Sequence, residues 1–342
     1  MTSSDPPRRR PTIADVARRA GVSAAAVSFA VNDRPGVSPD TRERILVAAR
    51  ELGWRPSASA RALTEARTRA IGLVLARDTE QLELDAFFIR FLSGIERALT
   101  DADYALLLQL VPGGAGAALP AYERLAAAGR VDGFLLTDVE LDDPRFALLE
   151  ASGVPVVLAG RPVGECPFTW VETRHEEGMR GPVEHLAALG HERVSFFGGR
   201  ADYEHVQVRL SRWREAIDAV GVEEGLAVHA DDREAAAAAE VLLAGEPTAV
   251  VCASDVLALA VVGAARERGL AVPADLSVTG FDDSPLAALA SPPLTSVRVD
   301  YGEFGEAAAG ALLAAIGVAD APDYQPSAPE LVVRASTAAP PG

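Results

Sequence analysis

The sequence predicts a small all-α head with a helix-turn-helix, followed by an α/β body of two doubly wound lobes with parallel sheets. Capped helical segments fill residues 12–53, whereas short apolar runs alternate with helical patterns from residue 70 onward. Charge divides the chain at the same place. Residues 1–69 contain 13 arginines and 7 acidic residues, whereas residues 70–342 contain 19 arginines and 42 acidic residues. This asymmetry indicates a basic head that meets phosphates and an acidic body that does not.

Polar caps and glycines mark the ends of three short helices in the head. They are Thr12 with Asp15 and Gly21 for the first helix, Ser23 for the second, and Ser38, Pro39 and Gly53 for the third. Apolar residues at helical spacings give these helices one small shared core. The tight turn A-G-V-S joins the first two helices, which is the sequence form of a helix-turn-helix. The recognition helix is therefore expected at Ser23–Asn32.

The segment RPSASARALTEART joins the head to the body. Pro56 interrupts the backbone that follows the third helix, and Ser57 can cap one or two helical turns that extend through Leu63. Because so short a helix is not stable alone, we expect a linker that orders conditionally. The predicted organisation is a helix-turn-helix domain at residues 1–56, a hinge helix and linker at 57–69, and a two-lobed domain at 70–342.

Apolar runs in the body predict strands, among them IGLVLA, DGFLLT, VPVVLA and TAVVCAS, and helical patterns such as Glu177–Leu189 lie between them. Residues 70–342 are too many for one such sheet, so we expect two similar lobes with a cleft. Ligands of open α/β sheets bind at the carboxyl ends of strands. The loops of interest therefore follow Ala76, Thr137, Ala159, Gly199, Ala253 and Gly280.

The sequence disfavours several classes of protein. No apolar run is long enough for a transmembrane helix, and the N-terminus lacks the apolar core of a secretory signal. Cys166 and Cys252 lie far apart in apolar settings, which fits a reduced cytoplasmic protein without disulfides or a zinc site. No catalytic, metal-binding or cofactor-binding motif is present. We expect no enzyme activity, metal or cofactor; the rival interpretation is a sugar-binding module or an enzyme that kept an α/β body.

Six segments, in order, resemble the LacI/GalR family of bacterial transcription regulators. They are TIADVARRAGVS, VSPDTRERIL, ELGWRPSASARAL, VEHLAALGHERVSFFGG, the run from ASDVLALAVVG to PPLTSVR, and ELVVRAST. The resemblance implies a hinge helix and a body of periplasmic-binding-protein type, with lobe 1 at about residues 70–161 and 293–325 and lobe 2 at about 162–292 and 326–342. The implied function is a sequence-specific DNA-binding repressor. Its operator affinity is controlled by a small-molecule effector, a sugar or sugar derivative, bound between the lobes.

The resemblance also implies a homodimer on double-stranded operator DNA, in the cytoplasm and without a membrane contact. The chain ends LVVRASTAAPPG, without a heptad tail, which predicts a dimer and not a tetramer. In the family, hinge helices lie in the minor groove and a leucine wedges into the central base step. Leu63 matches that leucine and would kink the operator. The alternative is that Leu63 only packs within a linker helix.

The recognition helix departs from the family, which usually has an arginine where Phe29 stands. Bidentate arginine-to-guanine contacts are lost at that position. Ala25 and Phe29 lie four residues apart on one face, and the base contact that they can make is an apolar one with thymine methyl groups. The alternative is that Phe29 turns inward against the first helix. Neighbouring polar side chains can still bond phosphates. The expected DNA contacts are Thr12, Ser23, Ala24, Ala25, Ser28, Phe29, Asn32, Thr41, Arg61 and Leu63.

Matching positions in the body imply an effector site formed by Asp85, Phe88, Arg174, Arg209, Ser254 and Asp282. The loop ARDTEQLELDAFF is longer than is usual in the family and is acidic. Arg174 replaces a family acidic residue, and together with Arg209 it could clamp an anion such as a sugar acid or phosphate. The alternative is that Arg174 pairs with Glu172, Glu176 or the acidic loop. The sequence leaves the effector and the direction of its effect open.

Overall fold

The computed structural model describes residues 11–31, 34–54, 67–77 and 86–342. The chain divides into two compact units, Met1–Thr68 and Arg69–Gly342. Most of the expected hinge, including Arg61 and Leu63, lies outside the described residues. Within the described segments, no helix is long and apolar enough to cross a membrane.

Three helices form the head: α1 (Ile13–Ala20), α2 (Ala24–Val31) and α3 (Pro39–Leu52). Each starts at the cap that the sequence predicts. The Thr12 N–H donates to Asp15 Oδ2 at 2.9 Å. The hydroxyls of Ser23 and Ser38 accept from backbone N–H groups three residues onward, at 3.2 Å and 3.3 Å. These bonds satisfy donors that the start of a helix leaves unpaired, so the three caps fix where the helices begin.

The head has a small apolar core to which every helix contributes. Val16 of α1, Val27 of α2 and Ile45 of α3 have no exposed surface. Full burial of a side chain of this size stabilises the fold by about 1.5–3 kcal/mol. This core leaves the other faces of the helices free to meet a partner.

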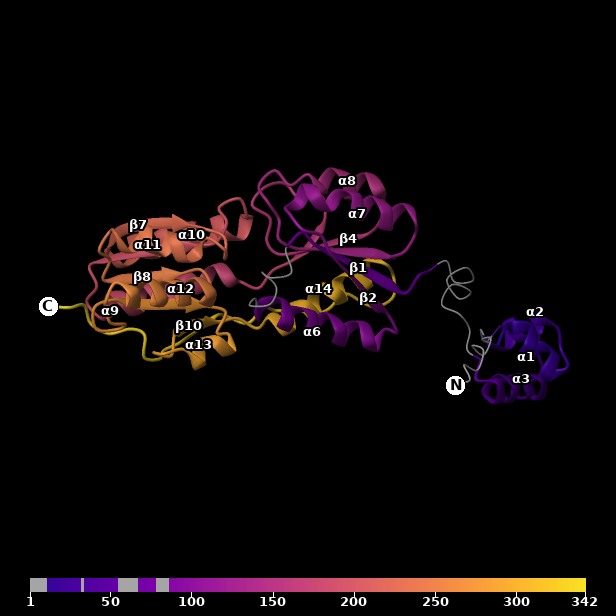
Figure 1. The fold of residues 1–342 in the computed structure, drawn as a ribbon. Helices are drawn as coiled ribbons and strands as arrows, with labels where there is room; N and C mark the ends of the chain where they lie inside the picture. The colour runs from indigo at the N-terminus through magenta and orange to yellow at the C-terminus, as the bar shows by residue number, and fades with distance from the viewer. Residues whose placement is uncertain (1–10, 32–33, 55–66, 78–85) are drawn as a thin grey trace, which may run out of the picture. The chain divides into compact units, whose positions relative to one another are not determined.

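The first lobe of the body is built on a parallel sheet with strand order β2-β1-β3-β4-β5. Its strands are β1 (Ala70–Leu75), β2 (Ala105–Leu110), β3 (Gly133–Leu136), β4 (Val156–Ala159) and β5 (Thr169–Val171). Its helices are α6 (Ala86–Asp101), α7 (Ala115–Ala127), α8 (Arg145–Ser152) and α14 (Tyr301–Ala315). Figure 1 shows α7 and α8 on one face of the sheet and α6 and α14 on the other. The lobe is therefore doubly wound, as expected.

The second lobe has a sheet with strand order β11-β10-β9-β8-β6-β7. Its strands are β6 (Arg193–Gly198), β7 (Glu223–His229), β8 (Ala249–Cys252), β9 (Ser277–Phe281), β10 (Thr295–Arg298) and β11 (Glu330–Val332). Only the β10–β11 pair is antiparallel in this sheet of the described chain. Its helices are η1 (His175–Met179), α9 (Arg180–Ala188), α10 (Glu204–Val220), α11 (Ala235–Leu243), α12 (Asp255–Glu267) and α13 (Pro285–Leu289).

The chain crosses between the lobes later than the sequence predicts. β5 still belongs to the first lobe because it pairs with β4, and β10 belongs to the second because it pairs with β9. Ser296 Oγ of β10 also donates to Asp255 Oδ1 at 2.5 Å, which ties β10 to the second lobe. The expected boundaries at about residues 162 and 293 are therefore corrected to the segments after Val171 and after Arg298.

Candidate functional site

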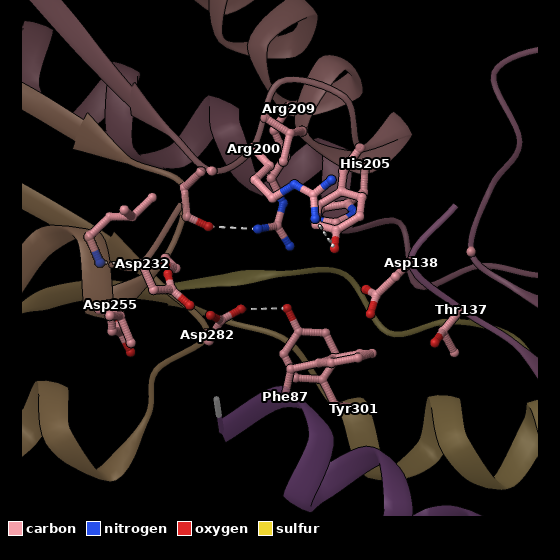
Figure 2. A pocket seen from close by; sticks show the side chains of 18 of the residues that line it. Phe87, Thr137, Asp138, Arg200, His205, Arg209, Asp232, Asp255, Asp282 and Tyr301 are labelled. Atoms are coloured by element: carbon pink, nitrogen blue, oxygen red, sulfur yellow. Dashed lines mark hydrogen bonds between the residues drawn. The ribbon is translucent and has the colours of Figure 1, made fainter. Parts of the chain in front are cut away.

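A pocket lies between the two lobes, at the carboxyl ends of their parallel strands (Figure 2). Every loop that the strand-end rule selected contributes to it. The pocket residues that follow β1, β3, β4, β6, β8 and β9 include Arg77, Asp138, Gly160, Arg200, Ser254 and Asp282. The segment after β7 adds Asp231 and Asp232. The pocket therefore belongs to both lobes, and its shape depends on how the lobes meet.

Arg209 of α10 lines the pocket, as expected for an effector residue. Its Nη1 donates to the carbonyl of Ala253 at 2.6 Å, and its guanidinium carbon lies 4.1 Å from the ring centroid of Phe281. These contacts fix the orientation of the guanidinium. Its Nε is buried and makes no hydrogen bond with any described residue, so it is an unsatisfied donor beside the pocket.

Two aromatic rings form the side of the pocket that faces Arg209 and Arg200 in Figure 2. The rings of Phe87 and Tyr301 meet edge to face, with centroids 4.8 Å apart. The Tyr301 hydroxyl donates to Asp282 Oδ1 at 2.7 Å. This bond holds the Asp282 carboxylate beside the rings, so an apolar surface and an acceptor adjoin each other there.

Arg77 and Asp138 form a bidentate pair at the first-lobe side of the pocket. Arg77 Nε and Nη2 donate to the two Asp138 oxygens at 2.7 Å and 2.9 Å. The Arg77 guanidinium carbon lies 4.9 Å from the ring centroid of Phe88 and 5.5 Å from that of Tyr203. Because Tyr203 precedes α10, this arginine links side chains of both lobes. Its charge is already balanced by Asp138.

Ser254 and Asp255 have structural partners at the start of α12. The Ser254 hydroxyl accepts from the Leu257 N–H at 3.2 Å and so caps the helix. Asp255 is 2% exposed, and burial raises the pKa of its carboxyl although hydrogen bonds from Ser296 and Ser284 oppose that rise. Asp255 therefore organises the loops after β8 and β9, while Ser254 lines the pocket as expected.

Several titratable side chains of the pocket have shifted pKa values, among them His205 and Asp232. Burial lowers the pKa of His205 well below its usual range, and the charges of Arg209 and Arg77 add to this shift. The imidazole is therefore neutral at pH 7 and can accept a hydrogen bond. Burial raises the pKa of Asp232, although the charge of Arg77 opposes the rise. No group of described residues has the composition of a metal site.

Three expected effector residues are not among the described residues that line the pocket. Phe88 is 1% exposed and lies beneath Arg77, so the expectation that it lines the pocket is corrected: the adjacent Phe87 does so. Arg174 is also outside the pocket lining. Its Nε and Nη2 donate to the carboxylate of Glu177 at 2.8 Å and 2.6 Å. The clamp by Arg174 and Arg209 is therefore not formed. Asp85 lies outside the described residues.

Arg174 pairs with Glu177, three residues onward in the chain. The carboxylates expected from the sequence were Glu172, Glu176 or those of the acidic loop, and Glu177 is none of these. Other pocket residues were not expected from the sequence: Arg77, Phe87, Thr137, Asp138, Arg200, His205, Asp232 and Tyr301. Most of these follow a strand end, so the strand-end rule already pointed to their loops. His205, Phe87 and Tyr301 lie on or beside helices, where no sequence signal separated them from core residues.

The exposed face of α2 is the second candidate site. Ala24, Ala25 and Phe29 are exposed on it, and Ser28 is partly exposed. Phe29 is 39% exposed, so it does not turn inward into the head core. The hydroxyls of Thr12, Ser23 and Thr41 lie at helix starts and take part in capping bonds. Asn32, Arg61 and Leu63 lie outside the described residues.

Comparison with known proteins identifies the class to which this arrangement belongs. Residues 12–57 match the family of bacterial regulatory proteins of the lacI type, and residues 183–337 match a periplasmic binding protein-like domain. The chain is 37% identical to the HTH-type transcriptional regulator MalR of Streptomyces coelicolor over 346 residues, which cover 96% of this chain and 97% of that protein.

Solved structures agree. A transcriptional regulator CelR–cellobiose complex is 33% identical, with a TM-score of 0.72, and the match covers 96% of this chain and all of that one. The lac repressor dimer bound to operator and an anti-inducer is 27% identical, with a TM-score of 0.82, over 97% of this chain and all of that one. The chain belongs to the LacI family of bacterial regulatory proteins. It is a DNA-binding transcriptional regulator, and the resemblance seen in the sequence is confirmed.

Proposed function

We propose that this protein is a homodimeric repressor whose head binds operator DNA and whose body binds a neutral carbohydrate between the lobes. Effector binding changes how the lobes meet, and the hinge transmits that change to the heads. Each ligand then alters the affinity for the other by the same factor. The lac repressor structure, a dimer on operator DNA, and the CelR complex with cellobiose support this proposal.

One observation carries the carbohydrate assignment: a fixed arginine and two carboxylates face an aromatic wall. Arg209, Asp232 and Asp282 offer donors and acceptors for neighbouring hydroxyl groups. Phe87 offers an apolar aromatic surface against which the C–H face of a sugar ring can pack. The Thr137 hydroxyl, which is buried and has no hydrogen-bond partner among the described residues, adds a further polar contact.

The charge of the pocket favours a neutral ligand over an anion. Arg77 is balanced by Asp138, and Arg200 pairs with Glu140 and Asp202. The remaining pocket arginine, Arg209, shares its surroundings with Asp232 and Asp282, the second of which already accepts from Tyr301. An anionic group would meet these carboxylates, so a sugar acid or sugar phosphate is disfavoured.

The DNA side of the proposal uses the residues expected from the sequence. The hydroxyls of Thr12, Ser23 and Thr41 lie at helix starts, where they and the adjacent N–H groups can meet phosphates. Leu63 is proposed to wedge into the centre of the operator, and Arg61 to contact the adjacent DNA. We further propose a cytoplasmic location, two chains per assembly, and no catalytic activity.

A ligand screen tests the effector assignment. Isothermal titration calorimetry against glucose, cellobiose, maltose, glucuronate and glucose 6-phosphate should show binding of a neutral sugar and none of the acids. The same sugar should change the mobility shift of DNA from upstream of the coding region. Arg209→Ala should abolish sugar binding, because it removes the donors that face the ligand.

The matched control for that variant is Arg214→Ala on the same helix. Arg214 pairs with Glu224 at 3.0 Å, both are about half exposed, and neither lines the pocket. This variant should bind the sugar as the unaltered protein does. Tighter binding of glucuronate or the sugar phosphate than of any neutral sugar would refute the neutral-ligand assignment. Light scattering that shows a stable four-chain species would refute the dimer.

A further inference from the structure

The recognition helix α2 presents an apolar face to solvent. Ala24, Ala25 and Phe29 are exposed, whereas Val27 and Ala30 are buried in the head core. Ala25 and Phe29 are four residues apart, so their side chains are neighbours on one side of the helix. The exposed face and the core face are thus both apolar, and only the first is open to a partner.

Bidentate hydrogen-bonded base readout, which needs Arg, Lys, Asn or Gln, is not available to the side chains of Ala24–Val31. Between Ala24 and Val31, Ser28 has the only polar side chain. The hydroxyl of Ser23, one residue earlier, accepts from the Ala26 N–H as the helix cap. Bases in the major groove are distinguished by donors, acceptors and the thymine methyl group. The methyl group is the feature that an apolar face can contact.

The ring of Phe29 is positioned by the turn that follows α2. Gly36 has a φ of +116°, and a Cβ at Gly36 would lie 3.4 Å from Cδ2 of Phe29. The Phe29 carbonyl also accepts from the Arg34 N–H at 2.9 Å. Gly36, whose positive φ favours glycine, therefore lies beside one part of the ring. The ring remains 39% exposed, so its free surface has a defined place beside Ala25.

We infer that Phe29, together with Ala25, recognises the C5-methyl group of a thymine in each operator half-site. The inference rests on the proposed function, because it requires α2 to lie in the major groove. Phe29 is then a specificity-determining residue that reads a base without a hydrogen bond. A 5-methylcytosine offers the same methyl group, but thymine is the source in unmodified DNA.

The experiment is a thymine-to-uracil scan of the operator, measured by fluorescence anisotropy with the full-length protein. Uracil lacks only the methyl group, so at one position per half-site the affinity should fall about four-fold, the factor for exposing one methyl-sized group to water. Phe29→Ala should remove the thymine–uracil difference, because the two changes share one interaction. Phe29→Leu, which stays apolar, should retain a difference. Phe29→Arg should shift preference toward guanine at or beside that base pair.

Leu46→Ala is the matched control. Leu46 is an apolar residue of α3 with 38% exposure, close to that of Phe29, and this variant should keep the thymine–uracil difference. Circular dichroism establishes that each variant is folded. If folded protein binds the operator but tolerates uracil at every position, the inference is wrong. If the unaltered protein binds no DNA at all, the proposed function itself is wrong, so the two failures are distinguishable.

Discussion

Arg145 shows how a single buried charge supports the pocket. Its side chain is 1% exposed and pairs with Asp143, which is equally buried, at 2.6 Å. Arg145 Nη2 also donates to the carbonyl of Asp138 at 2.7 Å. Burial by itself lowers the pKa of Arg145, but the hydrogen bonds that Arg145 donates to Asp143, together with the electrostatic influence of Tyr122, Asp143 and Asp138, outweigh it and the net pKa is raised. The guanidinium thus stays charged and fixes the backbone of a pocket residue.

Removal of one partner from this pair should destabilise the first lobe. Asp143→Ala leaves a buried guanidinium without its carboxylate, a change that costs about 3–5 kcal/mol. Urea denaturation followed by circular dichroism should show this loss in the free energy of unfolding. The double variant Asp143→Leu with Arg145→Met removes both charges and should recover most of the stability. Equal losses in the single and double variants would contradict this account.

At the scale of the element, α3 shows how a local sequence signal becomes a helix boundary. Ser38 accepts the Thr41 N–H, and Pro39 occupies the first helical position, where its missing N–H is not needed. The helix ends at Gly53, which has a φ of +63°. Only glycine adopts that conformation without strain. All these residues were recognisable from the sequence because each acts within one turn of its own position.

Loss of the Ser38 cap should weaken the start of α3. Ser38→Ala removes the acceptor for an unpaired backbone donor, which costs about 1 kcal/mol. Native-state hydrogen exchange should therefore be about five-fold faster for amides in the first turns of α3. Ser38→Asn retains a capping oxygen and should exchange at nearly the original rate. Unchanged exchange in Ser38→Ala would show that the cap contributes nothing to this helix.

At the scale of the body, the loops after β3 and β6 join the two lobes beside the pocket. The Leu141 N–H donates to the Asp202 carbonyl at 2.8 Å, and the Glu204 N–H donates to the Val139 carbonyl at 2.9 Å. Arg200 Nη2 donates to Glu140 Oε1 at 3.3 Å. These bonds can form only when the lobes are close, so they favour the closed arrangement that surrounds a ligand.

Glu140→Gln should weaken effector binding by favouring the open arrangement. The amide oxygen can still accept from the Ala115 N–H, as Glu140 Oε1 does at 3.0 Å, but the charge facing Arg200 is lost. A partly exposed pair of this kind contributes up to about 1 kcal/mol, so effector affinity should fall about two- to five-fold. Calorimetry measures the affinity, and stopped-flow kinetics should show faster dissociation.

The control for that variant is Glu306→Gln. Glu306 pairs with Arg97 at 3.0 Å, and both side chains belong to the first lobe, so the pair does not report on lobe closure. Effector affinity should be unchanged. An equal loss in both variants would mean that charge in general, and not the contact between the lobes, controls binding.

The sequence by itself determined the helix caps, the alternation of strands and helices, the loops at the strand ends and the family. Each of these depends on residues that are close in the chain or on their order along it. The tertiary structure decided the rest. Adjacent residues of a helix point about 100° apart, so only packing against the sheet decided that Phe88 is buried and Phe87 lines the pocket.

The same limit applies to charges and to the crossings between lobes. From the sequence, Arg174 could pair with several carboxylates or with a ligand. In the structure it precedes η1, whose helical geometry places Glu177 within ion-pair distance. β7 begins with two exposed glutamates at the edge of its sheet, so its sequence lacks the apolar run that marked the central strands. β5 and β10 are short, and pairing with β4 and β9 decided their lobes. Strand pairing joins residues far apart in the chain, which no local pattern specifies.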